Sequence, residues 1–277
     1  MGDVEKLRAC WALLREAVQL PRLRIDLRAD AVKGRDPHYH ALTESYFRHA
    51  TSRHPKMPLM GRLQLGVAVC QLPTSPDGYR SQLPSTAQRN IRKAERAGYR
   101  FERIDYNAHL DAITDIHRSS QERQGRALSA QLLATTPPTD TPASNLDSHD
   151  YPFFGVFHPD GRLVAYACCF VAGELCSIDR IFGHHDHLSA GVVPLLIARI
   201  AEDTIQHRPG VRHLTYGTYF GASPTLRRFK RKFQFVPHRV TWLLSHTGVP
   251  MLLDCMADLL TDSLALDVFI EASPYLV

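Results

Sequence analysis

The chain has 277 residues, a mass of 31.2 kDa, a formal net charge of +5 and a pI near 8.9. Its composition, 44% hydrophobic and 22% charged, excludes a disordered chain, a collagen-like repeat and a coiled coil. No stretch approaches the roughly 18 apolar residues of a membrane span, and the charged N-terminus lacks the pattern of a secretion signal. We expect a cytoplasmic protein of one large or two small domains, with no membrane partner.

The six cysteines form no CxxC pair, so neither a zinc ribbon nor a thioredoxin-type redox site is predicted. We expect all six to be reduced and mostly structural. The mildly basic charge permits an anionic partner, such as a nucleotide, a phosphorylated cofactor or RNA, without requiring one.

The first half of the chain mixes helical and strand patterns with polar segments. No element is assigned to the polar stretch 34–58, and the Pro- and Thr-rich residues 125–150 predict a flexible insertion or a lid. The remaining patterns predict helices at 3–17, 85–98 and 107–122, strands at 23–27, 63–72 and 99–104, and a turn at 74–78.

From residue 151 the pattern is more regular. It predicts strands at 153–158, 163–171, 175–182, 211–216 and 233–244, and helices at 190–206, 221–232 and 250–264. The first three strands are joined by hairpin turns and should be antiparallel, whereas the later strands are separated by helices, which favours parallel neighbours. A sheet that changes its connection in this way has a crevice between the strands 175–182 and 211–216, where ligands tend to bind.

This order of elements over residues 151–244 resembles the GNAT acyltransferase superfamily. The stretches RNIRKAERAGYRFERID and LTYGTYFGASPTLRRFKRKFQFVPH are similar to its FemAB-like branch, whose members carry a basic helix before a strand and an F-K-x-x-F-x-F junction. The resemblance implies an α/β (α+β) fold, with a GNAT-like mixed sheet flanked by helices. Three segments follow: an N-terminal lobe, extension or reduced GNAT half at 1–105, an acyltransferase core at 106–248, and a helical tail at 249–277.

The family resemblance implies transfer of an activated acyl group to an amine of a small molecule or peptide, without a permanently bound cofactor. Two features depart from the family pattern. The loop expected to bind a pyrophosphate reads HHDHLSAG, and Phe229 stands where many members place a tyrosine acid. Acyl-CoA and aminoacyl-tRNA therefore stay equally open as co-substrates, with tRNA a candidate partner. A non-catalytic binding module with the same fold is the alternative.

Asp179 is the most unusual residue of the predicted sheet, because a charge in an apolar strand is costly unless it is paired or used. We predict that Asp179 deprotonates or orients the acceptor amine. An ion pair with Arg180 or an exposed face is the alternative. His184, which can titrate near neutral pH, and Tyr219, which can replace the missing acid, are the other predicted catalytic residues. Packing of the Tyr219 ring is equally open.

Donor binding is predicted at two kinds of position: the loop before the helix at 190–206, whose free N–H groups can hold a phosphate, and two basic tracts that suit RNA or nucleotide phosphates. A solvated surface is the alternative for the tracts. The predicted donor-binding residues are Arg180, His185, Ser189, Ala190, Gly191, Arg92, Lys93, Arg96, Arg228, Lys230 and Arg231. Tyr216, Thr218 and Ser223, which flank glycines at a strand-to-helix junction, are predicted to bind the acceptor. The histidines at 184–187 are too closely spaced to supply a full ligand set, so no metal is predicted.

Overall fold

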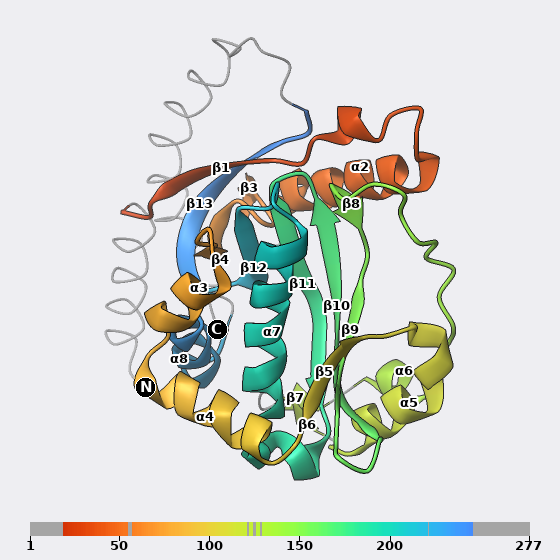
Figure 1. The fold of residues 1–277 in the computed structure, drawn as a ribbon. Helices are drawn as coiled ribbons and strands as arrows, with labels where there is room; N and C mark the ends of the chain where they lie inside the picture. Colours follow the sequence, from red (N-terminus) through yellow and green to blue (C-terminus); the bar gives the residue numbers. More distant parts are fainter. Residues whose placement is uncertain are drawn as a thin grey trace.

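The computed structural model describes residues 19–54, 57–120, 122–123, 126–127, 129–220 and 222–245 (Figure 1). The helices predicted at 3–17 and 250–264 lie outside these residues, as does the predicted tail 249–277. None of the helices in the described ranges has the length and hydropathy of a membrane span.

A mixed sheet of nine strands dominates the described part of the chain. Across the sheet the order is β1 (Arg22–Asp26), β13 (Val236–Leu243), β4 (Leu65–Gln71), β12 (His213–Thr218), β11 (Leu175–Gly183), β10 (Leu163–Ala172), β9 (Phe153–Phe157) and β5 (Arg100–Arg103), with β8 (His149–Asp150) also paired to β10. Two short pairs lie outside it: β2 (Arg53–His54) with β3 (Met57–Gly61), and β6 (Glu122–Arg123) with β7 (Arg126–Ala127). The predicted mixed α/β sheet is confirmed.

Helices cover both faces of the sheet (Figure 1). They are α2 (Pro37–Thr51), α3 (Pro76–Gln82), α4 (Ser85–Arg96), α5 (Leu110–Arg118), α6 (Ala130–Leu133), α7 (Val192–His207) and α8 (Pro224–Lys232), with 3₁₀ helices η1 (Ala29–Ala31), η2 (Tyr106–His109) and η3 (His185–Ala190). One apolar cluster joins α3, α4 and α7 to the sheet, and two others join α2 and α5 to the opposite face.

The central strand β10 explains how the two faces are filled. Cys169 and Val171 belong to the cluster under α7, whereas Phe170 and Cys168 belong to the clusters under α2 and α5. All ten residues of β10 are buried. An uninterrupted apolar run of this kind is typical of a strand covered on both faces.

In the first half of the chain, one stretch without an assigned element contains a helix, and one predicted turn was wrong. The polar stretch 34–58 contains α2, in which the Asp36 side chain accepts a hydrogen bond from the backbone N–H of Tyr39 and Pro37 follows at the first helical position. The turn predicted at 74–78 is the start of α3, where Ser75 accepts from the N–H of Gly78. In both cases a capping side chain followed by proline was the available sequence signal.

The N-terminal part of the chain belongs to the same sheet as the rest. β4 lies between β12 and β13 and is antiparallel to both, and β1 is parallel to β13. The sheet is therefore continuous across residue 105, and the boundaries of the three predicted segments stay a prediction.

The turn between β10 and β11 packs against the end of β1, and a glycine permits this contact. Gly173 has φ +55°, and a Cβ added there would overlap the carbonyl oxygen of Asp26. We predict that Gly173→Ala lowers the free energy of unfolding by about 2–3 kcal/mol, because positive φ and the backbone overlap both add strain. Urea denaturation measures this loss.

Gly161→Ala is the matched control. Gly161 also has positive φ, but no described heavy atom lies within 4 Å of its added Cβ. The Gly161→Ala substitution should lower the free energy of unfolding by about 1 kcal/mol, from the positive φ alone. Equal losses for the two variants would contradict the proposed contact with β1.

Candidate active site

The strands β11 and β12 part soon after they meet. Their parallel register joins only Leu175 with His213, Cys176 with Leu214, and Ser177 with Thr215. β11 nevertheless continues to Gly183 and β12 to Thr218. The separation expected between these strands is confirmed. Within the described residues, the backbone of β11 from Ile178 to Arg180 has no pairing partner in β12.

A β-bulge lies on β11 where the strands part. Cys169 pairs with Ile178 and Cys168 with Arg180, so Asp179 is an extra residue with no counterpart on β10. Successive strand side chains normally face opposite sides, but a bulge changes their direction. As a result the side chains of Asp179 and Arg180 are both about half exposed, at 53% and 55%.

The carboxylate of Asp179 accepts a hydrogen bond from Tyr151, which lies between β8 and β9 along the chain. The Tyr151 hydroxyl donates to Asp179 Oδ2 at 2.6 Å, whereas the Arg180 Nε atom is 3.9 Å from the same oxygen. Burial, together with the negative charge of Asp179, raises the pKa of Tyr151 and keeps its hydroxyl protonated. The arrangement leaves an exposed carboxylate beside the parted strands, where it can accept a proton from an amine.

A second tyrosine lies near the last paired residues. Tyr46 of α2 stacks on Phe170 with ring centroids 4.8 Å apart, and it meets Trp242 edge-on at 5.5 Å. Burial raises its pKa to about 12, and the side chains of Ser177 and Thr215 oppose part of this shift. Sequence reasoning missed Tyr46 because it did not assign α2.

Lys230 is buried rather than on the surface expected for a phosphate contact. Its Nζ atom donates to the carbonyl oxygens of Tyr216 at 2.6 Å and Thr218 at 2.8 Å. These carbonyls follow Thr215, the last residue of β12 that pairs with β11. Burial lowers the pKa of Lys230 to about 8. Lys230 thus stabilises the end of β12 where it leaves β11, and we treat it as a positioning residue.

The other predicted residues at the end of β12 differ in accessibility. Tyr219 is buried in the apolar cluster under α7, with the guanidinium groups of Arg227 and Arg231 near its ring, a placement that favours the packing alternative. Ser223 Oγ accepts from the N–H of Leu226 and caps α8, so this hydroxyl already has a structural role. Tyr216 and Thr218 are partly exposed.

In the loop predicted to bind a donor phosphate, several backbone N–H groups already donate hydrogen bonds to other protein atoms. His185 N donates to Ser119 Oγ, Asp186 N to His184 Nδ1, His187 N to His184 O, and Gly191 N to Leu188 O. In the first turn of α7, Pro194 has no N–H to offer. A pyrophosphate needs several free backbone donors, and these contacts leave four N–H groups of the loop unable to serve.

Helix α4 packs closely against this loop. Lys93 Nζ donates to the carbonyl oxygen of Ser189 at 2.8 Å. Gly191 has φ +90°, and a Cβ added there would lie 2.5 Å from the carbonyl oxygen of Asn90. Ala190 ends the 3₁₀ helix η3 at the same place. The start of α7 is therefore partly covered by α4.

His184 lies away from Asp179. They are five positions apart along the chain, which corresponds to about 16 Å in an extended strand. The His184 Nε2 atom is 3.5 Å from Asp115 and its Nδ1 atom is 4.0 Å from Asp186. In the described part of the chain, no group of three or more His, Cys, Asp or Glu side chains could hold a metal ion.

Exposed basic residues lie on both α4 and α8. Arg92, Lys93 and Arg96 are exposed on α4, and Arg228 and Arg231 are exposed on α8. The two helices lie near each other, because the Gln234 side chain after α8 donates to the carbonyl oxygen of Gln82, which precedes α4, at 2.6 Å. We call the five exposed residues Arg92, Lys93, Arg96, Arg228 and Arg231 the basic surface.

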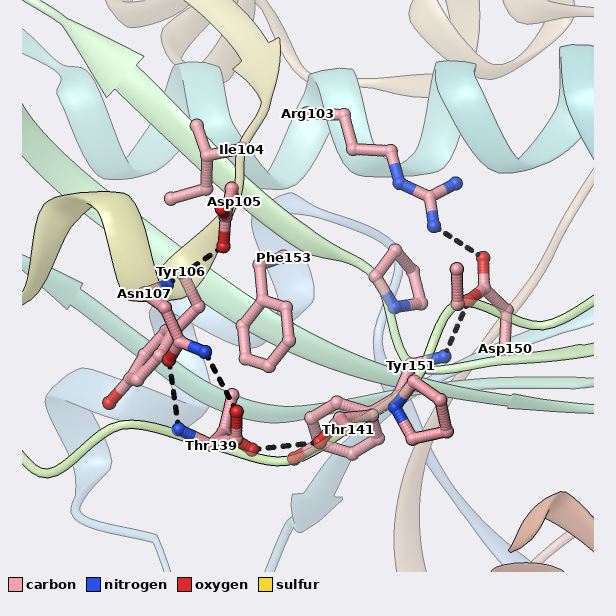
Figure 2. A pocket seen from close by; sticks show the side chains of 13 residues that line it. Arg103, Ile104, Asp105, Tyr106, Asn107, Thr139, Thr141, Asp150, Tyr151 and Phe153 are labelled. Atoms are coloured by element: carbon pink, nitrogen blue, oxygen red, sulfur yellow. Dashed lines mark hydrogen bonds and ion pairs between the residues drawn. The ribbon is translucent and has the colours of Figure 1, made fainter.

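A pocket of about 190 Å³ has Tyr151, the hydrogen-bond partner of Asp179, among the residues that line it (Figure 2). Part of the predicted insertion forms one side. The Tyr39 hydroxyl donates to the carbonyl oxygen of Pro142, and Asn107 forms two hydrogen bonds with the backbone of Thr139. These contacts fix residues 139–142 across the pocket. Sequence reasoning missed this pocket because three separate segments of the chain line it.

Comparison with known families matches residues 82–231 to the acetyltransferase (GNAT) domain family. The chain belongs to this family. Comparison with curated proteins found no match.

Among solved structures, the GNAT chain shares its fold with FemX, at 11% identity and a TM-score of 0.52 over 74% of this chain and 67% of that one. L-PGS from Bacillus licheniformis is 14% identical, with a TM-score of 0.42 over 72% and 65% of the two chains. A tandem GNAT protein from the clavulanic acid biosynthesis pathway is 14% identical, with a TM-score of 0.40 over 70% and 55%. This GNAT chain thus spans 55% to 67% of the lengths of these structures.

The buried ammonium of Lys230 predicts a pH-dependent contribution to stability. Its folded pKa of about 8 is below the ordinary value of 10.5, so the folded state binds fewer protons between these two values. The free energy of unfolding of the natural protein should therefore rise relative to Lys230→Met from pH 8 to pH 10.5, by at most about 1.4 kcal/mol per pH unit.

Urea denaturation of both proteins at several pH values measures this difference. Other ionisable groups are common to the two proteins and largely cancel. If the difference in the free energy of unfolding between the two proteins stays constant across this pH window, burial does not lower the pKa of Lys230.

Proposed function

We propose that this chain is an N-acyltransferase that moves an aminoacyl group from aminoacyl-tRNA to an amine of a small molecule. The observation that carries the proposal is the parting of β11 and β12 after Ser177 and Thr215, with the exposed carboxylate of Asp179 at the same place. Membership of the GNAT family supports the reaction class.

The parted strands and Asp179 supply two of the functions that acyl transfer needs. Backbone N–H groups of β11 between Ile178 and Arg180 can donate to the carbonyl oxygen of the donor and stabilise the negative charge that develops on it. The amine nitrogen attacks the carbonyl carbon and Asp179 accepts the proton that the amine loses. The ester bond of the donor then breaks, and its oxygen leaves with the proton returned from Asp179.

The phosphate-loop geometry and the basic surface favour tRNA over acyl-CoA as the donor. A pyrophosphate would need free N–H groups in the loop before α7, but the N–H groups of His185, Asp186, His187 and Gly191 already donate to other protein atoms. A tRNA can instead place its backbone phosphates on exposed arginines and lysines, without such a loop. The basic surface on α4 and α8 supplies these side chains.

A donor screen tests this proposal. The protein is incubated with a mixed pool of amines and, separately, with charged tRNAs or acyl-CoA thioesters, and the products are identified by mass. We expect products from charged tRNAs. If only acyl-CoA thioesters yield products, the donor is acyl-CoA and the proposed tRNA donor is wrong. If neither pool yields a product, the chain is better explained as a non-catalytic binding module.

Removal of the Asp179 charge should slow the reaction strongly. We predict that Asp179→Asn lowers kcat by about a hundredfold, because the amide cannot accept the amine proton. Tyr151→Phe should have a smaller effect, about tenfold, since it only removes a hydrogen bond that orients the carboxylate.

Steady-state kinetics with the donor found in the screen measures both effects. Glu44→Gln is the control, because Glu44 on the outer side of α2 pairs with Arg48 and His40 away from the parted strands. An Asp179→Asn protein that folds and turns over at the natural rate would remove Asp179 from the mechanism.

Reversal of charge on α4 should weaken tRNA binding. We predict that Arg92→Glu with Lys93→Glu lowers the affinity for tRNA and reduces the slope of log K against log salt by about 1–2, because two phosphate contacts are lost. Lys33→Glu with Arg48→Glu changes the net charge equally on exposed residues outside the basic surface. Filter-binding titrations at several salt concentrations compare the pairs. Equal losses for both pairs would mean that tRNA does not bind at α4.

A further inference from the structure

A buried carboxylate in the wall of the pocket binds two arginines. Asp150 of β8 is 4% exposed and accepts hydrogen bonds from Arg103 Nη2 at 2.8 Å, from Arg208 Nη2, and from the backbone N–H of Tyr151 at 2.8 Å. One carboxylate cannot neutralise two guanidinium groups, so this cluster carries one excess positive charge.

The two arginines have different surroundings. Arg208 is only 14% exposed, and it also donates to the carbonyl oxygen of Asp147. Together with the Tyr151 N–H, it satisfies the buried charge of Asp150. Arg103 is 54% exposed and lines the pocket. Its contact with Asp150 uses one nitrogen of a guanidinium that can make several hydrogen bonds. Arg103 is therefore the cation that the cluster presents to the pocket.

The rest of the pocket limits what this charge can bind. The rings of Tyr106, Tyr151 and Phe153 form an apolar side, with centroids 4.8 and 5.4 Å from one ring to the next. Asp105 lies in the wall, where its side chain accepts from the N–H of Asn107 (Figure 2). The charge of Asp105 would repel a ligand that carries a second carboxylate on that side of the pocket. A volume of about 190 Å³ suits a molecule of amino-acid size.

We propose that this pocket is the acceptor site and that it binds a small amino acid by its carboxylate, which pairs with Arg103. The inference rests on the proposed function, because it assigns the acceptor of that reaction. Tyr151 connects the two sites, since it lines the pocket and donates to Asp179. An amino acid held at Arg103 can thus extend its amine along Tyr151 towards the carboxylate that accepts its proton.

Binding without any donor tests the acceptor site separately from the chemistry. The probes are the L-amino acids and β-alanine, each compared with its C-terminal amide, and titration calorimetry gives the affinities. We expect at least one amino acid to bind and its amide to bind about tenfold to a hundredfold more weakly, because a charge-assisted hydrogen bond is lost.

The variant Arg103→Gln should weaken binding of the acid by a similar factor and should bind acid and amide equally. Arg103→Lys should keep part of the preference for the acid. Arg100→Gln is the matched control on the same strand, because Arg100 pairs with Glu102 outside the pocket, and it should bind as the natural protein does. Thermal unfolding checks that Arg103→Gln folds, which we expect because Asp150 can keep its contact with Arg208.

Three results would overturn the acceptor site: no probe binds, acid and amide bind equally to the natural protein, or Arg103→Gln keeps the preference for the acid. The donor screen is read independently. If amino acids bind in an Arg103-dependent way but no donor yields product, the proposed transfer fails and the binding site stands.

Discussion

The structure depends on the early end of the pairing between β11 and β12. Two parallel strands in the middle of a sheet would normally continue to exchange hydrogen bonds, because unpaired backbone groups are costly when buried. Here the ladder stops after Ser177 and Thr215, and the surrounding residues compensate for the loss. The bulge at Asp179 redirects the side chains of β11, and Lys230 donates to the carbonyls at the end of β12.

This local arrangement links the two faces of the sheet to one reaction. On the face of α4 and α7, helix α4 packs against the loop before α7 and four N–H groups of that loop are already hydrogen-bonded, while basic residues remain exposed on α4 and α8. On the other face, the pocket lined by Arg103 and Tyr151 is connected to Asp179 through the Tyr151 hydroxyl. Donor and acceptor would thus reach the parted strands by separate routes, with Asp179 between them.

Much of the sheet could be predicted from sequence, but the side-chain partners could not. Alternating or continuous apolar runs located β10, β11 and β12 to within a few residues, and the change from hairpins to helical connections located the point where strands part. Local patterns do not reveal long-range partners. Asp179 was identified by its charge, but Tyr151 is 28 residues away in sequence, and Asp150 meets arginines from β5 and the end of α7. In the sequence, Lys230 could not be distinguished from the exposed basic residues around it. In the structure it is buried and donates to the Tyr216 carbonyl at the end of β12.

The most direct test is a crystal structure with a stable analogue of the donor, an aminoacyl group joined through an amide to 3′-amino-3′-deoxyadenosine. The account predicts that its carbonyl oxygen lies between β11 and β12, within about 3 Å of a backbone N–H of Ile178, Asp179 or Arg180. An analogue bound with its carbonyl elsewhere, while these N–H groups face only solvent or protein, would contradict it.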